Sequence, residues 1–334
     1  MSGLSKESAQ RFALGNMSVI LLVAVFLLFV LLDPRFLSVQ NLLNIGAQAS
    51  FIGILAVGMT FVLLIAGIDL SVGAVAYLAA VLMSHLLRDV GMSVVGVALA
   101  MILIGAVAGF LNGAATSLLR ITPFIVTLAA MGVYRGLALG QSQSREANFP
   151  TELISVGASR PLGVPMPLWI FVVVLIVANV VLTRTSYGRQ LYAVGRDATE
   201  ATKAGLPVRR ITWSAYVVSG ALAGLAGFVS VIQMGTIVPA YGVGNEFDAI
   251  AAAVLGGASL FGGRGTVLPG ALVGTLLVQT IAVGLVFTRV DLYLTPMVSA
   301  GVIFLAVVLD TLRTRRLDRL SRQRIRLETA VLVE

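Results

Sequence analysis

A single carboxylate between two apolar runs is the first feature that could carry chemistry. Asp69 lies in the segment Gly67–Gly73, which reads GIDLSVG. A charged side chain close to membrane hydrocarbon is expensive, so its presence needs a reason. Asp69 or Ser71 could cap the next helix by accepting hydrogen bonds from free N–H groups. Asp69 could also be a polar point on a solute path, and the two roles are compatible.

A second acidic group precedes a helix rich in small residues. Asn245, with Asp248 three residues on, resembles a capping box in which Asp replaces the usual Glu or Gln. The chain then turns at Gly262–Gly265. We expect Glu246 and Asp248 at the outer mouth of a membrane bundle. There they either cap the helix or contact a polar solute or a docking protein.

The polar loop 184–210 contains a short helix signal of its own. Asp197 with Glu200 three residues on predicts a helix N-terminus, while Gly205 predicts its end and Pro207 prevents its continuation. A helix of two turns is marginal in water by itself. We therefore expect this one to be held, either in the groove of a partner protein or against the chain's own bundle.

Polar side chains inside apolar runs are the other candidate points of contact. Asn112 must find a hydrogen-bond partner, by default on a neighbouring helix, and contact with solute is the alternative. The lone histidine, His85, is expected at the membrane interface near the outer end of a span. The candidate residues on a solute path are Asp69, Asn112, Phe124, Thr127, Glu246 and Asp248.

Catalysis within this chain is not expected. There is no cysteine and only one histidine, so thiolate and polyhistidine metal sites are excluded, and we predict no metal and no cofactor. The only lysines are Lys6 and Lys203, and neither lies in a phosphate-binding loop. No serine nucleophile elbow is present. We therefore predict a protein that is not an enzyme.

The elements that must position these residues are membrane-spanning helices. Of the 334 residues, 58% are hydrophobic and 11% are charged, and the mean hydropathy is +1.00, which a soluble domain of this length could not bury. We predict an all-α polytopic bundle of about ten helices, in which 247–261 could be re-entrant. The apolar runs are 17–32, 47–66, 72–87, 92–119, 124–140, 165–183, 211–233, 247–261, 266–287 and 292–310.

The basic residues give this bundle an orientation. If the N-terminus is inside, 17 of the 23 Lys and Arg residues fall on the cytoplasmic side, as the positive-inside rule requires. Most of the net charge of +8 is explained in this way, so nucleic acid is not an expected partner. We predict a transmembrane domain over 1–312 and a basic cytoplasmic tail over 313–334, which lies on anionic lipid.

Glycines recur every four residues in three of the predicted spans. They are Gly105, Gly109 and Gly113, Gly220 and Gly224, and Gly270 and Gly274. Small residues at this spacing let helix backbones approach closely in lipid. A compact bundle is the favoured interpretation over a stripe that pairs two copies of the chain.

Four stretches, in this order, resemble the ribose-type permeases of bacterial ATP-binding-cassette (ABC) importers. They cover most of the chain, from about 46 to 310. The most specific are GIDLSVG and DAIAAAVLGGASLFGGRG, because chance agreement of both is remote. The family-like segments are GMTFVLLIAGIDLSVGA (58–74), NG with PFIVTLAAM (112–113 and 123–131), YGRQLYAVGRDATEATKAGL (187–206) and EFDAIAAAVLGGASLFGGRGTVLPGAL (246–272).

The resemblance implies partners and a role for the short helix. Such permeases work as two chains, identical or paralogous, with ABC ATPase subunits on the cytoplasmic side and a periplasmic sugar-binding protein outside. It implies a bacterial inner membrane, with both termini in the cytoplasm. The cytoplasmic helix would seat in the ATPase and couple hydrolysis to transport. The residues carried over to that element are Arg196, Asp197, Ala198, Thr199, Glu200, Ala201, Ala204, Gly205 and Leu206.

Other transport classes stay open at this point. A related ABC permease for branched-chain amino acids or nucleosides is the nearest alternative. An ion-coupled secondary transporter would need acidic residues near the membrane centre, and Asp69 is nearly the only candidate. The polar segment 140–165 and the length of the basic tail are not accounted for by the resemblance.

Overall fold

The computed structural model describes residues 16–89, 91–289 and 291, with single positions at 294, 297, 300, 301, 304 and 308. These residues are mostly helical. The chain divides into two compact units. The larger is Leu37–Gln279, and the smaller combines Met1–Phe36 with Thr280–Glu334. Six helices in the described part are long and apolar enough to cross a membrane. The N-terminal Lys6 and the tail 313–334 lie outside the described residues, as does most of the run 292–310.

The first apolar run forms helix α2 (Met17–Leu32), with the bounds that the sequence predicts. It leads into a short 3-10 turn, η1 (Pro34–Leu37). Phe36 packs against Phe29, with ring centroids 5.4 Å apart, and edge-on against Phe287 at 5.2 Å. The carboxylate of Asp33 pairs with the guanidinium of Arg35 at 2.8 Å, which lowers the pKa of Asp33.

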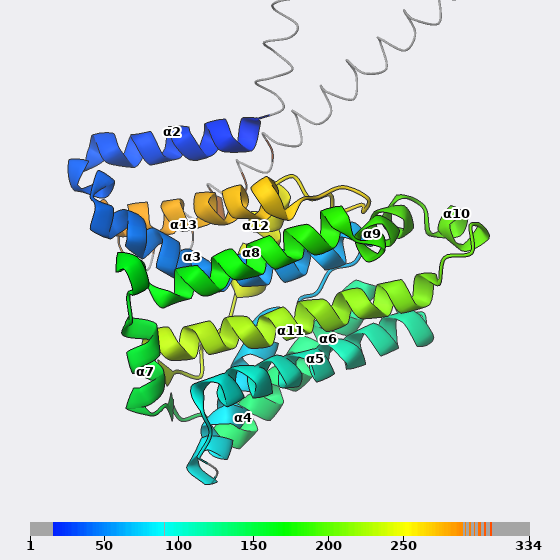
Figure 1. Ribbon diagram of the computed structural model, residues 1–334, viewed down its shortest axis with the longest axis horizontal. Helices are drawn as coiled ribbons and strands as arrows, with labels where there is room; N and C mark the ends of the chain where they lie inside the picture. Colours follow the sequence, from blue (N-terminus) through cyan, green and yellow to red (C-terminus); the bar gives the residue numbers. More distant parts are fainter. Residues whose placement is uncertain are drawn as a thin grey trace, which may run out of the picture. The chain divides into compact units, whose positions relative to one another are not determined.

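The larger unit is a bundle of helices with one small strand pair (Figure 1). Helix α13 begins in it and continues beyond Gln279. Its elements are α3 (Val39–Leu64), α4 (Val72–Asp89), α5 (Val94–Leu118), α6 (Pro123–Ser142), β1 (Ala147–Asn148), α7 (Thr151–Ala158), η2 (Pro161–Gly163), α8 (Met166–Arg184), α9 (Ser186–Arg196), α10 (Ala198–Lys203), α11 (Val208–Met234), β2 (Thr236–Ile237), α12 (Asn245–Leu255), η3 (Val267–Ala271) and α13 (Leu272–Phe287).

Hydroxyl caps fix where several of these helices begin. Ser38 accepts a hydrogen bond from Asn41 N at 3.4 Å, so α3 starts at Val39 rather than at 47, where the apolar run begins. Ser93 and Thr185 cap α5 and α9 in the same way. Pro207 is the N-cap of α11, which therefore starts at Val208.

Helices α5 and α11 pack backbone to backbone along their glycines. A Cβ added at Gly105 would collide with the carbonyl of Gly220, and one at Gly224 with the carbonyl of Met101. Trp213 adds a hydrogen bond from Nε1 to the carbonyl of Phe110, at 2.8 Å. The repeat of glycines therefore serves close packing within one chain, which confirms the compact-bundle interpretation.

Helix α12 differs from its predicted start and end. The residue that precedes its first turn is Gly244, which has a left-handed backbone (φ +87°), and no side chain caps the helix. The predicted capping box on Asn245 is therefore wrong, because Asn245 is already the first helical residue. The helix ends at Leu255, where Gly256 packs against Gly270 and Gly274 against Ala252.

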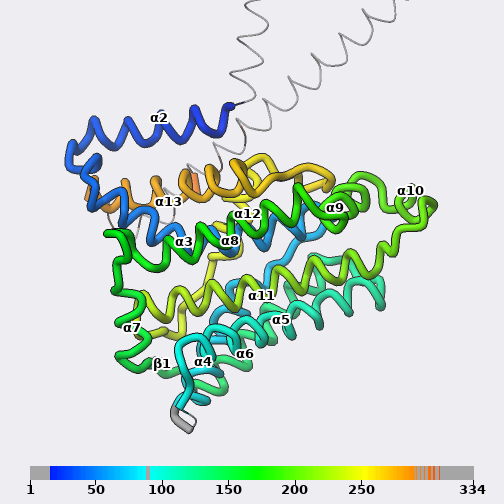
Figure 2. Tube along the Cα trace, in the orientation of Figure 1, coloured from blue at the N-terminus to red at the C-terminus, as the bar shows by residue number. Residues whose placement is uncertain are grey.

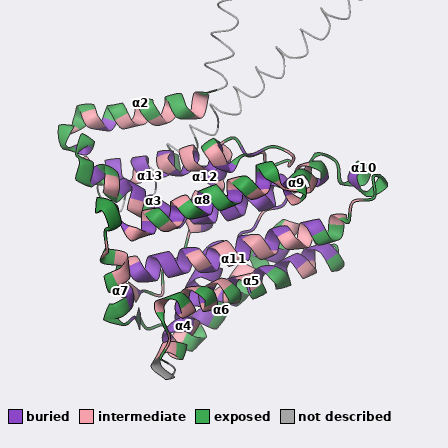
Figure 3. Ribbon diagram, viewed as in Figure 1, coloured by how far each residue is buried: buried purple, intermediate pink, exposed green. Residues whose placement is uncertain are grey.

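The larger unit has two distinct ends. Helix α7 lies at one end of α11, and α9 and α10 lie at the other (Figure 2). The antiparallel pair β1–β2, with Ala147 opposite Ile237, lies at the α7 end. The C-terminal part of α3, from Ala49 to Leu64, is buried throughout and forms the centre of the core. Helix α10, by contrast, is largely exposed (Figure 3).

Candidate functional site

The carboxylate of Asp69 is buried at the break between α3 and α4. Its Oδ1 accepts from Ser71 N at 3.1 Å and from Ser71 Oγ at 2.7 Å. Its Oδ2 accepts from Ser219 Oγ of α11 at 2.9 Å. The predicted cap is confirmed in part, because Asp69 binds the N–H just before Val72, the first residue of α4. Among the described residues, no cation pairs with this carboxylate.

The hydrogen bonds continue from Ser71 to two further helices. Asn112 of α5 donates from Nδ2 to Ser71 Oγ at 2.8 Å and accepts from the hydroxyl of Tyr134 of α6 at 3.0 Å. Thr127, also on α6, donates to the carbonyl of Ile68 at 3.1 Å. We call Asp69, Ser71, Asn112, Thr127, Tyr134 and Ser219 the break network.

The break network is an intrachain structure. Asp69 is 1% exposed, Asn112 is 2% exposed and Thr127 is fully buried. Each hydroxyl in it has an acceptor within the chain, as buried polar groups in a membrane require, and all of these bonds except the one from Ser71 to Asp69 reach another segment. The sequence-predicted partner of Asn112 on a neighbouring helix is confirmed. Ser219 and Tyr134 were not predicted, because single hydroxyls in apolar helices carry no periodic signal.

The other path candidates lie outside this network. Glu246 is 5% exposed, and its Oε2 lies 3.0 Å from where a Cβ on Gly73 would be, so it sits against the start of α4. Asp248 is partly buried on the same helix as Glu246. Phe124 is 49% exposed in the first turn of α6. His85 Nε2 lies 3.0 Å from the carbonyl oxygen of Gln141, to which it donates when its proton is on Nε2.

The short helix α10 is closed at both ends by its own residues. Asp197 Oδ1 accepts from the N–H groups of Thr199 and Glu200, at 2.8 and 3.0 Å, which confirms the predicted N-cap. At the other end, Leu206 N donates to Ala201 O and Gly205 N to Thr202 O, both at 3.0 Å. With Gly205 at φ +80°, this is a Schellman motif.

Most of α10 has no cover from the rest of the chain. Ala201 is its one buried residue, and the residues from Arg196 to Glu200 are exposed, as are Ala204 and Gly205. The salt bridge between Lys203 and Glu200 is also exposed, so it contributes little. A helix this short, exposed on most sides, presents a surface rather than filling a core.

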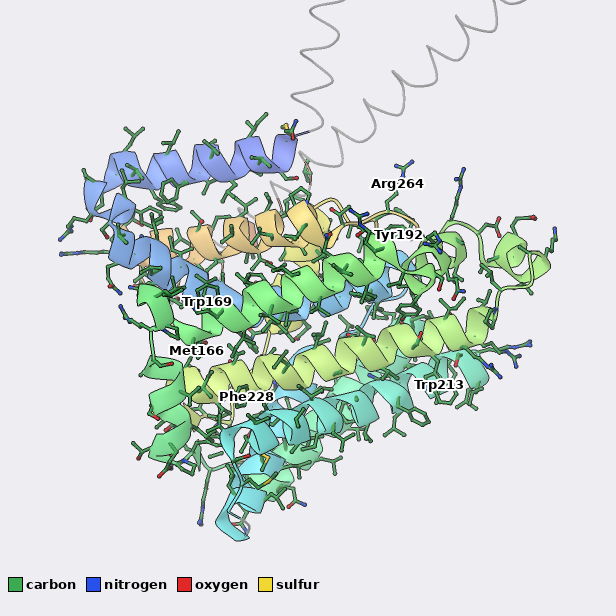
Figure 4. All side chains as sticks on the ribbon, in the orientation of Figure 1. Met166, Trp169, Tyr192, Trp213, Phe228 and Arg264 are labelled. Carbon is green, nitrogen blue, oxygen red and sulfur yellow. The ribbon has the colours of Figure 1, made fainter. Side chains whose placement is uncertain are left out.

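Helix α9 links α10 to the C-terminal end of α3. The hydroxyl of Tyr192 donates to the carbonyl of Gly265 at 2.7 Å, and burial raises the pKa of this hydroxyl, which keeps it protonated. Gly263 N donates to the carbonyl of Leu64, the last residue of α3, at 2.9 Å. Tyr192 and Arg264 lie near this junction, while Trp213 lies on α11 (Figure 4).

The loop after α12 therefore joins α9 to the helix that leads into the break network. We call 259–265 the junction loop. Ser259 N donates to the carbonyl of Arg264 at 2.9 Å, which closes the loop and leaves Phe261 90% exposed. No role beyond a turn is predicted for this segment from the sequence. Its run of glycines was the available signal.

The chain matches the family model described as "Branched-chain amino acid transport system / permease component" over residues 41–307. That match covers most of the sequence and every helix from α5 to α13.

The chain belongs to this family.

Curated relatives of this permease chain agree in length as well as sequence. It is 35% identical to the ribose import permease protein RbsC of Haemophilus influenzae over 92% of this chain and 96% of the relative. It is 38% identical to RbsC of Escherichia coli K12, over 88% and 92%. It is 36% identical to the autoinducer 2 import system permease protein LsrC of Shigella flexneri, over 91% and 90%.

A solved structure shares the fold. It is a chain from an inward-facing conformation assigned to a metal-chelate type ABC transporter, with a TM-score of 0.50 and 17% identity. The match covers 90% of this chain and 99% of that chain. This permease chain is thus a multi-pass membrane protein with an ABC-transporter permease fold.

Proposed function

We propose that this chain is the transmembrane subunit of an ABC importer and forms the path for a sugar or a closely related polyol. The observation that carries the proposal is α10, a capped helix with only Ala201 buried, which is joined through α9 and the junction loop to the end of α3. The names of the relatives, ribose and autoinducer 2 import permeases, support the cargo class.

The proposed partners are a separate ABC ATPase, a periplasmic binding protein and a second permease chain. The ATPase holds α10 in a cleft through the surface from Arg196 to Leu206, and it supplies the hydrolysis that this chain is not expected to perform. When ATP binding moves α10, α9 transmits the displacement to the inner end of α3. Rigid elements joined by packed contacts can carry such a switch.

The proposed topology puts the α10 end in the cytoplasm and the α7 end outside. Ten spans, with both termini inside a bacterial inner membrane, follow from the charge distribution. The domain from 1 to 312 and the tail from 313 to 334 keep their sequence-based assignments. In this orientation the α7 end receives the binding protein.

The role that we propose for the break network is structural, and it does not include solute binding. Asp69, Asn112 and Thr127 hold the interruption between α3 and α4 in one geometry, because their bonds are made to each other's segments. Glu246 and Asp248 are kept as candidates near the path, and Phe124, in the first turn of α6, is kept as a candidate toward its cytoplasmic end, since α6 leads from there to β1 at the α7 end.

A branched-chain amino acid is the second candidate cargo, because the family model carries that description. An amino acid zwitterion would need charged partners on the path, whereas a neutral polyol needs only hydrogen-bonding groups.

Copurification with a candidate ATPase, followed by ATP hydrolysis in lipid nanodiscs, tests the proposal. We expect hydrolysis to rise when a binding protein loaded with D-ribose is added. Stimulation by a leucine-loaded binding protein instead would show that the cargo is a branched-chain amino acid and not a sugar. A chain that retains no ATPase and moves solute under an ion gradient would overturn the proposal.

A further inference from the structure

Three side-chain amides follow one side of the outer half of α3. Gln40, Asn44 and Gln48 are spaced four residues apart, so they lie one above another on the helix. All three are exposed. We call them the amide ladder. At 1.5 Å per residue, Gln48 lies about 12 Å farther into the membrane than Gln40.

The depth of the ladder is set by contacts at its two ends. Gln40 accepts from Arg160 Nη1 at 3.2 Å, which fixes it at the η2 and α7 end of the unit. Below Gln48, from Ala49 onward, α3 is buried to its end. The exposed amides therefore run from the proposed outer surface to well inside the span and stop where the helix enters the core.

The amide ladder is only partly paired. Gln40 Nε2 donates to Asn44 Oδ1 at 3.0 Å, and Gln279 Nε2 of α13 donates to Gln48 Oε1 at 3.1 Å. Within the described residues, Asn44 Nδ2 and Gln48 Nε2 have no hydrogen-bond acceptor. Each amide nitrogen carries two donors, so the ladder still has donors to offer.

Lipid cannot satisfy these donors, because hydrocarbon has no acceptor and an unpaired polar group there costs several kcal/mol by general estimates, on the order of 2–7. Water or a polar solute has the chemistry to satisfy these donors.

We propose that the amide ladder lines the outer part of the solute path, and that its free amide donors bind the hydroxyl oxygens of a neutral polyhydroxylated solute. Asn and Gln suit this task, because each amide both donates and accepts and carries no charge that would favour ions. The assignment rests on the proposed function. It places solute contact at the amide ladder and not at the break network, whose polar groups are already hydrogen-bonded within the chain.

Cysteine labelling tests whether the ladder faces water. The chain has no cysteine, so the variants Asn44→Cys and Gln48→Cys each carry a single thiol. The full importer in intact cells is treated from outside with a charged, membrane-impermeant methanethiosulfonate, which reacts with a thiolate in water. Leu42→Cys is the matched control, because Leu42 is 42% exposed on another side of α3, at a depth between those of Gln40 and Asn44.

We expect both ladder cysteines to react at least about tenfold faster than Leu42→Cys, since thiolate forms in water and not in lipid. Equal and slow labelling at all three positions would overturn the proposal, whether lipid, the chain's own helices or a second copy covers the ladder. Retention of the ATPase by the same preparations is scored separately, so a failed ladder is distinguishable from a failed importer assignment.

Uptake tests the chemistry of the ladder with radiolabelled D-ribose as the probe. Gln48→Leu removes the donors and is expected to lower uptake about tenfold, the effect of roughly one lost hydrogen bond. Gln48→Asn keeps an amide and should recover much of the uptake. Equal uptake by wild type and Gln48→Leu would overturn the proposed solute contact, while no uptake by wild type would count against the cargo class alone.

Discussion

Asn112 Nδ2 donates to Ser71 Oγ across 2.8 Å, which ties α5 to the point where α3 gives way to α4. Ser71 in turn donates to Asp69, and Asp69 also accepts from Ser219 on α11. One helix interruption is therefore held by polar groups from the helices around it. Because lipid offers no substitute partners, the loss of any one group leaves others unsatisfied.

Replacing Asn112 by leucine should destabilise the permease. The change keeps the side-chain volume but leaves Ser71 Oγ and the Tyr134 hydroxyl each short of one partner, which costs about 1–3 kcal/mol. Thermal unfolding in detergent measures the effect. Leu111→Ala, at an exposed position next door, is the control and should change the midpoint little. An unchanged midpoint for Asn112→Leu would mean that the break network does not stabilise the fold.

Enlarging Gly105 should separate α5 from α11. A valine there would collide with the backbone of Gly220, and overpacking of this kind typically costs about 1–3 kcal/mol or more. Size-exclusion chromatography should show less monodisperse protein. Gly136→Val on α6 is the matched control, because a Cβ there meets nothing within 4 Å. If both variants behave alike, the glycine contact does not determine the packing.

Changes in α10 should weaken coupling rather than folding. Gly205→Ala forces a side chain into a left-handed backbone at φ +80°, which costs about 1–2 kcal/mol and loosens the end of the helix. We expect lower stimulation of ATP hydrolysis by loaded binding protein, with normal membrane insertion. Glu200→Ala, which removes an exposed carboxylate from the proposed contact, should act in the same direction.

Gly163→Ala provides the control for that strain. Gly163 also has a left-handed backbone, at φ +81°, and its site is equally open, but it lies in η2 rather than near α10. Equal losses of stimulation in Gly163→Ala and Gly205→Ala would show that general strain, and not the proposed contact, is responsible.

Removing the Tyr192 hydroxyl should uncouple α9 from the junction loop. Tyr192→Phe loses the 2.7 Å bond to Gly265 O, a net loss of about 1 kcal/mol, without changing the apolar packing. The ratio of stimulated to basal ATP hydrolysis should fall. Tyr187→Phe removes a bond to Ser214 Oγ, on α11 instead, and is expected to reduce the ratio less. The reverse order would place the transmission route along α11.

Much of the architecture could be predicted because membrane helices are set by local sequence. A run of about 20 apolar residues must be helical in lipid, so the predicted runs at 17–32, 124–140 and 165–183 correspond to α2, α6 and α8 within a few residues. The cap at Asp197 and the stop at Gly205 were equally readable, since both depend on a few neighbouring residues. The α12 cap was mispredicted, because a left-handed Gly244 replaced the side-chain cap.

The sequence by itself determined the class of protein, the apolar helices and the two ends of α10, because each depends on composition or on contacts within one turn. Only the tertiary structure decided which polar groups are hydrogen-bonded within the chain and which still have donors to offer. It buried Asp69 and Asn112 in a shared network, and it left Gln48 exposed on α3. The physical reason is that a polar side chain in a membrane takes its role from its hydrogen-bond partner, and those partners lie on helices distant in sequence.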